Sequence, residues 1–155
     1  SRHNYWFYGV VYLYFSPILL FMKLILNTDG GSRGNPGPSA CGFVLMDMHD
    51  QVIVENGLAL GITTNNQAEY RSLKLGLEAA LEHKATVVHS YMDSMLVVNQ
   101  MNGLYKIKNR ELWPLNQQIR ELMRNFKEVR FNHIPRENNI AADKKVNEIL
   151  DAHNS

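Results

Sequence analysis

The order of β-rich and helical runs constrains the fold of this chain more than any other feature. Three β-rich runs follow one another without a helix between them, at residues 24–26, 41–48 and 51–60. Only His49 and Asp50 separate the last two runs, and this spacing is typical of a hairpin. The first part of the chain is therefore predicted to form three strands in an antiparallel meander.

Helices and strands alternate in the remainder of the chain. After a polar turn at residues 61–69, leucine and alanine recur at helical spacing up to about His83. The further expected elements are a strand at 86–92, helices at about 95–102 and 112–126, a strand at 129–134 and a final helix. Strands joined through helices run parallel to one another. We therefore predict an α/β domain with a mixed five-stranded sheet and helices on its faces.

A glycine-rich stretch at residues 28–38 follows the first strand. We interpret Asp29 as the end of that strand and the next residues as a turn, because glycine and proline are concentrated there. Gly30, Gly31 and Gly34 carry no Cβ, so a bulky anion could approach their backbone N–H groups closely. The stretch thus places a carboxylate beside a potential anion site.

Four carboxylates are expected to converge near the end of this strand. Asp93 ends the neighbouring parallel strand, and the following Ser94 is a plausible helix cap. Glu69 lies in the first turn of a helix, and Asp143 lies one turn into the last helix. Four clustered acids repel one another unless a hard cation such as Mg²⁺ or Mn²⁺ binds between them.

Each acid also has a simpler explanation when it is taken alone. Glu69 could close a capping box with Asn66, three residues before it. Asp29 and Asp93 could be ordinary turn residues, and Asp143 could be a solvent-facing helix position. The occurrence of all four in these contexts favours a metal site.

These motifs together resemble type 1 ribonuclease H over about residues 24–150. The matching segments are Thr28-Asp29-Gly30-Gly31, Gly34-Asn35-Pro36-Gly37-Pro38, Thr63-Thr64-Asn65-Asn66, Ala68-Glu69, Asp93-Ser94, Pro135-Arg136-Glu137-Asn138-Asn139 and Ala142-Asp143. The resemblance implies a ribonuclease H-like fold with strand order 3-2-1-4-5. It also implies that Asp29, Glu69, Asp93 and Asp143 are the catalytic acids and the metal ligands.

The resemblance implies an endonuclease that hydrolyses the RNA strand of RNA–DNA hybrids. Two Mg²⁺ or Mn²⁺ ions, roughly 4 Å apart, would activate water and stabilise the leaving oxygen. The products would carry 5′-phosphate and 3′-hydroxyl ends. We expect no small-molecule cofactor, a monomer and a cytoplasmic location.

The resemblance also implies a set of substrate contacts. The glycine stretch with Asn35 would contact the RNA backbone, and Thr64 and Asn66 would hold the DNA strand. The full expected set is Gly30, Gly31, Asn35, Thr64, Asn65, Asn66, Ser94 and Asn139. Roles in a turn for Asn35 and in a helix cap for Thr64 remain open.

The chain departs from the longer bacterial form of the family in two places. Only residues 103–109 stand where that form has an extra helix and a basic protrusion, so Lys106, Lys108 and the following helix are candidates for the hybrid grip. The histidine of the family's mobile loop has no counterpart. Arg136 occupies this loop, and we expect it to contact the scissile phosphate.

The N-terminal residues differ in character from the rest of the chain. Residues 5–22 carry no charge over a length near that of a membrane span, but four tyrosines and Pro17 interrupt the run. We predict a non-functional extension at 1–22 and a catalytic domain at 23–155. Membrane contact is expected only if residues 5–22 are a genuine anchor.

Charge and cysteine content restrict the partners of the domain. Ten of the 16 lysines and arginines fall between residues 104 and 145, against five acids, which suits a phosphate backbone and also suits solvated helix faces. Cys41 is the single cysteine, so an intrachain disulfide is excluded and burial in the core is expected.

Two alternatives to a hybrid-specific ribonuclease remain. A hybrid-binding module without catalysis is disfavoured because none of the four acids is missing. A DNA nuclease or transposase core is disfavoured by the glycine stretch and by the segment at residues 63–66.

Overall fold

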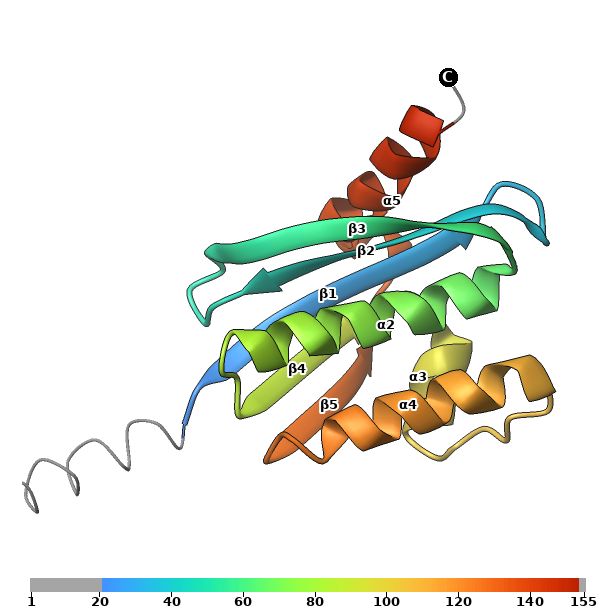
Figure 1. Cartoon of the computed structure of the whole chain (residues 1–155). Helices are drawn as coiled ribbons and strands as arrows, with labels where there is room; N and C mark the ends of the chain where they lie inside the picture. Colours follow the sequence, from blue (N-terminus) through green and yellow to red (C-terminus); the bar gives the residue numbers. More distant parts are fainter. Residues whose placement is uncertain (1–20, 154–155) are drawn as a thin grey trace, which may run out of the picture.

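A computed structural model describes residues 21–153 and contains one five-stranded sheet (Figure 1). The strands are β1 (Lys23–Ser32), β2 (Gly37–Met46), β3 (Val52–Thr63), β4 (Val87–Met92) and β5 (Glu128–His133). Their order across the sheet is β3-β2-β1-β4-β5, as the resemblance implied. The expected extension at residues 1–22 lies almost entirely outside the described residues.

The directions of the strands also agree with the prediction. β1 pairs with β2 and β2 with β3 in antiparallel fashion, while β1, β4 and β5 are parallel. In the parallel register Asn27 lies beside Tyr91, and Tyr91 lies beside Asn132. The carboxyl end of β4 therefore lies next to the part of β1 that carries Asp29.

Helices cover the sheet unequally on its two faces (Figure 1). α2 (Asn65–Glu82) and α4 (Trp113–Met123) lie on one face, and α5 (Ile140–His153) packs on the other face over β1, β2 and β3. The short α3 (Met95–Met101) follows β4, and two single turns, η1 (Arg110–Leu112) and η2 (Arg136–Asn138), precede α4 and α5. None of the helices within residues 21–153 combines the length and the apolar character that a membrane crossing needs.

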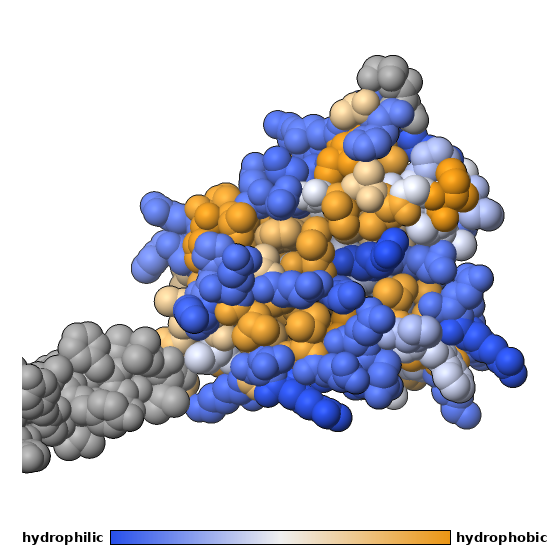
Figure 2. All heavy atoms as spheres, viewed as in Figure 1, coloured by the Kyte–Doolittle hydropathy of each residue, from blue (hydrophilic) through white to orange (hydrophobic). Residues whose placement is uncertain are grey.

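The main core lies between the sheet and α2. Its fully buried members include Leu26, Leu45, Tyr70, Leu77 and Val88. A smaller cluster under α5 contains Ala40, Val146 and Leu150. Cys41 is buried, as expected. Outside the core, apolar and hydrophilic side chains are interspersed on the α2 face (Figure 2).

The glycine stretch is a strand for longer than the sequence suggested. β1 does not end at Asp29 but continues to Ser32, because its ladder with β2 runs on to the pair Ser32 and Ser39. Gly30 is needed because helix α2 crosses the strand closely there. A Cβ on Gly30 would lie 2.2 Å from the carbonyl oxygen of Ala68. The turn itself is confined to residues 33–36.

Other boundaries also differ from the expectation: β2 begins at Gly37 rather than at residue 41, and β3 continues to Thr63 rather than ending at residue 60. The helix predicted to reach Phe126 ends at Met123, and Phe126 packs into the core just before β5. Its apolar character therefore reflects burial in the connection rather than helical periodicity. β5 begins one residue earlier than predicted, at Glu128.

Candidate active site

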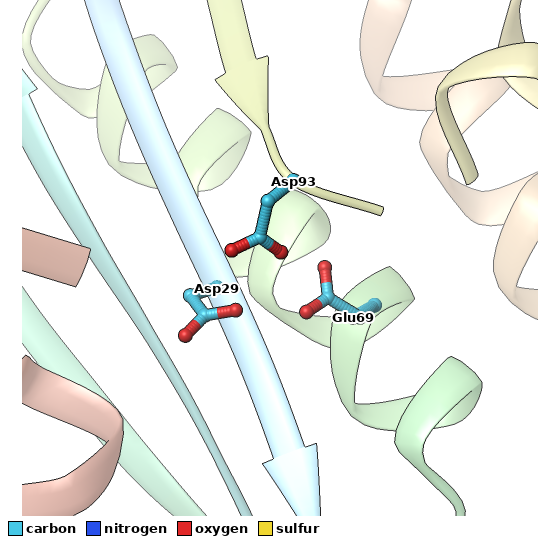
Figure 3. Close-up of side chains that lie close together, drawn as sticks. All are labelled: Asp29, Glu69 and Asp93. Atoms are coloured by element: carbon cyan, nitrogen blue, oxygen red, sulfur yellow. The ribbon is translucent and has the colours of Figure 1, made fainter. Parts of the chain in front are cut away.

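Three acids from three separate elements meet at the sheet (Figure 3). Asp29 comes from β1, Glu69 from α2, and Asp93 from the residue after β4. Each can offer one carboxylate oxygen such that these oxygens all lie within 4.8 Å of one another. The structure thus brings together three of the four acids that the sequence singled out.

Helix α2 directs Glu69 toward the strand. Its N-cap is Thr64, whose side chain accepts a hydrogen bond from Gln67 N at 3.2 Å, and Gln67 Oε1 accepts from Thr64 N at 3.0 Å. The capping box considered for Asn66 and Glu69 therefore does not form. Glu69 Oε1 instead accepts a hydrogen bond from Gly30 N at 3.1 Å, which fixes the carboxylate beside Asp29.

Burial and crowding shift the proton affinity of these acids. The pKa of Asp29 is raised from 3.8 to about 7, chiefly by burial; the hydrogen bond with Glu69 opposes this rise, and the charges of Asp93 and Asp143 contribute to it. Burial also raises the pKa of Glu69 well above its usual range, and the hydrogen bond with Asp29 adds to this effect. Without a cation, the pair therefore retains a proton near neutral pH.

Unpartnered oxygens at the centre of the cluster suit a hard cation. Glu69 Oε2 and Asp93 Oδ2 are buried and have no hydrogen-bond partner in the described part of the chain. Such atoms are costly to bury unless a ligand or a water satisfies them. A donor set made only of carboxylate oxygens matches Mg²⁺ or Mn²⁺ rather than a soft metal.

Asp143 and Arg136 lie at the rim of the same cleft, which has a volume of about 350 Å³. Asp143 is half-buried on α5, and its Oδ2 accepts a hydrogen bond from Asn147 Nδ2 at 3.2 Å. Its charge reaches Asp29, because it contributes to the raised pKa of that carboxyl. Arg136 is exposed in η2, so its guanidinium is available to an anion at the cleft.

Known proteins share this fold and sequence. Residues 27–149 match a family described as "Reverse transcriptase-like". A relative named Ribonuclease H, from Rhodopirellula baltica, is 34% identical over 117 residues, which cover 64% of this chain and 73% of the relative. The chain belongs to the type 1 ribonuclease H family of enzymes.

Two further relatives of this ribonuclease H domain are more similar in sequence. The protein named "Bifunctional protein Rv2228c" from Mycobacterium tuberculosis is 42% identical over 132 residues, covering 84% of this chain but only 36% of that protein. The chain therefore spans about a third of the length of that relative. The solved structure of LC11-RNase H1 in complex with an RNA/DNA hybrid has a TM-score of 0.81 and 39% identity, covering 85% of this chain and 99% of that one.

The turn and the start of α2, which both carry expected substrate contacts of the ribonuclease H family, are tied together. Asn35 Oδ1 accepts a hydrogen bond from Asn65 N at 3.0 Å, and Asn65 Oδ1 accepts one from Ser32 N at 2.9 Å. Thr64 is occupied as the cap of α2. Asn65 and Asn66 line the acidic cleft together with Gly30 and Gly31.

Ser94 and Asn139 have different surroundings. Ser94 lines the cleft, and its Oγ accepts a hydrogen bond from Val97 N at 3.3 Å as the cap of α3. Asn139 is fully buried, and its Nδ2 donates to the carbonyl oxygen of Thr28 at 2.9 Å. Asn139 therefore connects β1 to the start of α5, and its amide is not exposed to a ligand.

Some residues that line the cleft of this ribonuclease H domain were not predicted from the sequence. Ser32, Arg33 and Asn147 line it beside the predicted residues. Ser32 and Arg33 belong to the glycine stretch, and Asn147 follows Asp143 by one helical turn. The i, i+4 spacing of Asn147 and Asp143 was the available signal for their contact.

Proposed function

We propose that this chain is an endoribonuclease that hydrolyses the RNA strand of RNA–DNA hybrids. The observation that carries the proposal is the convergence of Asp29, Glu69 and Asp93, with unpartnered oxygens on the last two, in a member of the ribonuclease H family. A relative with the same fold was solved in complex with an RNA/DNA hybrid, which supports the hybrid as the substrate class.

The carboxylates of Asp29, Glu69 and Asp93, with Asp143 beside them, would hold divalent cations. We propose two Mg²⁺ or Mn²⁺ ions, which supply a more acidic bound water and stabilise charge on the leaving oxygen. The raised pKa of Asp29 supports this assignment, because a bound cation favours the ionised carboxylates that burial alone disfavours. The products would carry 5′-phosphate and 3′-hydroxyl ends.

The residues of the chain would orient the substrate around this centre. Gly30 and Gly31 line the cleft beside Asp29, and Arg136 at the rim can pair with a phosphate oxygen. Asn66 lines the acidic cleft and also a neighbouring groove of about 450 Å³ that contains Lys106 and Lys108. The acidic cleft and the groove with the two lysines are therefore neighbours that share Asn66, which supports a substrate long enough to reach both.

The start of the catalytic domain and the oligomeric state are also part of this proposal. We place the start of the catalytic domain at residue 23. The pairing at the beginning of the sheet reaches the residue just before this position, because Met22 N donates to Thr86 Oγ1 at 2.9 Å and Thr86 N donates to Met22 O at 2.8 Å. We also retain the expectation that the enzyme acts as a monomer.

Strand-specific cleavage tests the proposed function. The protein is incubated with Mg²⁺ or Mn²⁺ and with three labelled substrates, an RNA–DNA hybrid, duplex RNA and duplex DNA. Cleavage confined to the RNA of the hybrid supports the proposal. Cleavage of duplex DNA would refute it, and binding of the hybrid without cleavage under either ion would indicate a non-catalytic binding module.

Two matched variants connect the activity to the acidic cluster. Asp93→Asn should lower hybrid cleavage by at least about a thousandfold, because it removes a charged ligand at the centre of the site. Asp50→Asn makes the same chemical change at an exposed turn residue and should retain activity. Equal activity of the two variants would contradict the assignment.

A further inference from the structure

Residues 103–109, the connection between α3 and η1, form a segment without helix or strand. Its first residues bond to α3, since Leu104 N and Tyr105 N both donate to the carbonyl oxygen of Asn99. Gly103 has a φ of +75°, which starts the segment away from the helix. The side chains of Lys106 and Lys108 are exposed, while Ile107 packs against the core.

Side chains from α3 and α4 hold the middle of this segment. Gln100 Nε2 donates to the carbonyl oxygen of Lys106 at 3.4 Å. Trp113 Nε1 donates to the carbonyl oxygen of Ile107 at 2.8 Å. These bonds occupy backbone acceptors that a strand or a helix would otherwise satisfy.

Gln100 belongs to a larger polar network beneath the segment. We define this Tyr70 network by its members, Tyr70, Gln100, Asn116 and Arg120. Tyr70 Oη donates to Gln100 Oε1 at 2.6 Å and accepts from Asn116 Nδ2 at 3.3 Å. Arg120 Nε donates to Asn116 Oδ1 at 2.9 Å, and Arg120 Nη2 reaches the carbonyl oxygens of Gln100 and Met101.

Most of the Tyr70 network lies away from solvent. The side chains of Tyr70, Gln100 and Asn116 are 0%, 4% and 5% exposed. Polar groups at such depth are costly unless every partner is in place, so they fix one arrangement of the elements that carry them. Here they join α2, α3 and α4 to the carbonyl of Lys106.

We propose that the Tyr70 network positions Lys106 and Lys108 for binding the nucleic-acid substrate. This inference rests on the proposed function. The segment borders the groove that Asn66 shares with the acidic cleft. The exposed surface of the segment is mixed, because Leu104 and Tyr105 are exposed beside the two lysines. Ordering a segment without regular structure opposes binding, and the network provides that order before the substrate arrives.

Tyr70→Phe tests the proposal because it removes one oxygen and keeps the buried ring. Gln100 and Asn116 then lose a partner, and the segment should become less ordered. We expect KM for a hybrid substrate to rise by about threefold to tenfold while kcat stays within about twofold. Tyr91→Phe makes the same change on β4, outside the network, and should leave KM and kcat at their wild-type values.

A double substitution separates positioning from general stability. Lys106→Ala with Lys108→Ala should raise KM and reduce its dependence on salt, because two phosphate contacts are lost. In that background, Tyr70→Phe should add little to KM, since the side chains that it positions are absent. An increase of the same factor in both backgrounds would overturn the proposal.

Trypsin cleavage after Lys106 and Lys108 reports the order of the segment directly. Tyr70→Phe should increase the initial rate of cleavage at these two sites several-fold, at a temperature well below unfolding. If Tyr70→Phe does not fold, Gln100→Met is tested in its place. It keeps the length of the side chain but loses the amide donor, and it should also increase the rate of cleavage at these two sites. Unchanged cleavage in a folded variant would overturn the proposal.

Hybrid cleavage and the KM of Tyr70→Phe separate the proposed function from the role of the Tyr70 network. If the wild-type protein does not cleave the hybrid in the presence of Mg²⁺ or Mn²⁺, the proposed function is wrong. If it cleaves the hybrid and Tyr70→Phe has an unchanged KM, the hybrid activity stands and the role of the Tyr70 network is wrong.

Discussion

Replacing Asp29 with asparagine should stabilise the metal-free protein at pH 8 while it removes the activity. Asp29 is 5% exposed, and burial raises its pKa from 3.8 to about 7. Between these two values the folded state binds more protons than the unfolded state. The free energy of unfolding therefore falls as pH rises through this window.

The size of the expected stabilisation follows from the raised pKa of Asp29. The difference between a pKa of 3.8 and one of about 7 sets an upper bound of about 4 kcal/mol. Local relaxation and water entry reduce such penalties, and we expect about 2 kcal/mol. Asparagine carries no charge and can donate to Glu69, so Asp29→Asn should recover this amount at pH 8 and little at pH 4.

Urea unfolding in the presence of a chelator measures the difference. The free energy of unfolding is measured at pH 4 and pH 8 for the wild-type protein and for the variants Asp29→Asn and Asp50→Asn. Asp50→Asn makes the same change in net charge at an exposed position and should leave the pH dependence as it is.

Equal stability of Asp29→Asn and the unchanged protein at both pH values would refute the reasoning. It would mean that the carboxyl of Asp29 is solvated or paired in the folded protein. A lower stability of Asp29→Asn at pH 8 would refute it as well, because the buried charge would then be stabilising.

Three further predictions concern the surroundings of the cluster. Gly30→Ala should destabilise the fold by about 2 kcal/mol or more, measured by urea unfolding, because the new Cβ would lie 2.2 Å from the carbonyl oxygen of Ala68. Asn139→Ala should lower the free energy of unfolding by about 2 kcal/mol in the same assay, because it leaves the buried carbonyl of Thr28 without its donor. Burial raises the pKa of the Cys41 thiol to about 11, so the folded protein should react with a thiol reagent at pH 8 far more slowly than the unfolded chain; equal rates would contradict its burial.

The order of β-rich and helical runs was enough to predict a mixed five-stranded sheet with an antiparallel meander and parallel crossovers. The strand order that places β1 beside β4 was implied by the resemblance to type 1 ribonuclease H. The boundaries that differed depend on distant contacts instead. β1 extends to Ser32 because β2 pairs with it there, and neither the length of a ladder nor the packing of Phe126 is visible in a local pattern.

Side-chain roles were harder to predict than positions. A motif places Asn139 near the site, but only the fold shows that its amide faces the carbonyl of Thr28 and is closed to solvent. The Tyr70 network has no sequence signal, because Tyr70, Gln100 and Asn116 occupy separate helices with ordinary spacing. Polar residues that meet only through tertiary packing cannot be paired from one sequence.

Proton release on cation binding tests the central claim most directly. Calorimetric titration of Mg²⁺ or Mn²⁺ at pH 7, in buffers of different ionisation enthalpy, gives the number of protons displaced. Because the buried pair of Asp29 and Glu69 retains a proton without the cation, binding should release on the order of one proton per protein, and Asp29→Asn should reduce this number. Saturable binding without proton release, or no binding at all, would contradict the account of a metal-dependent acidic site.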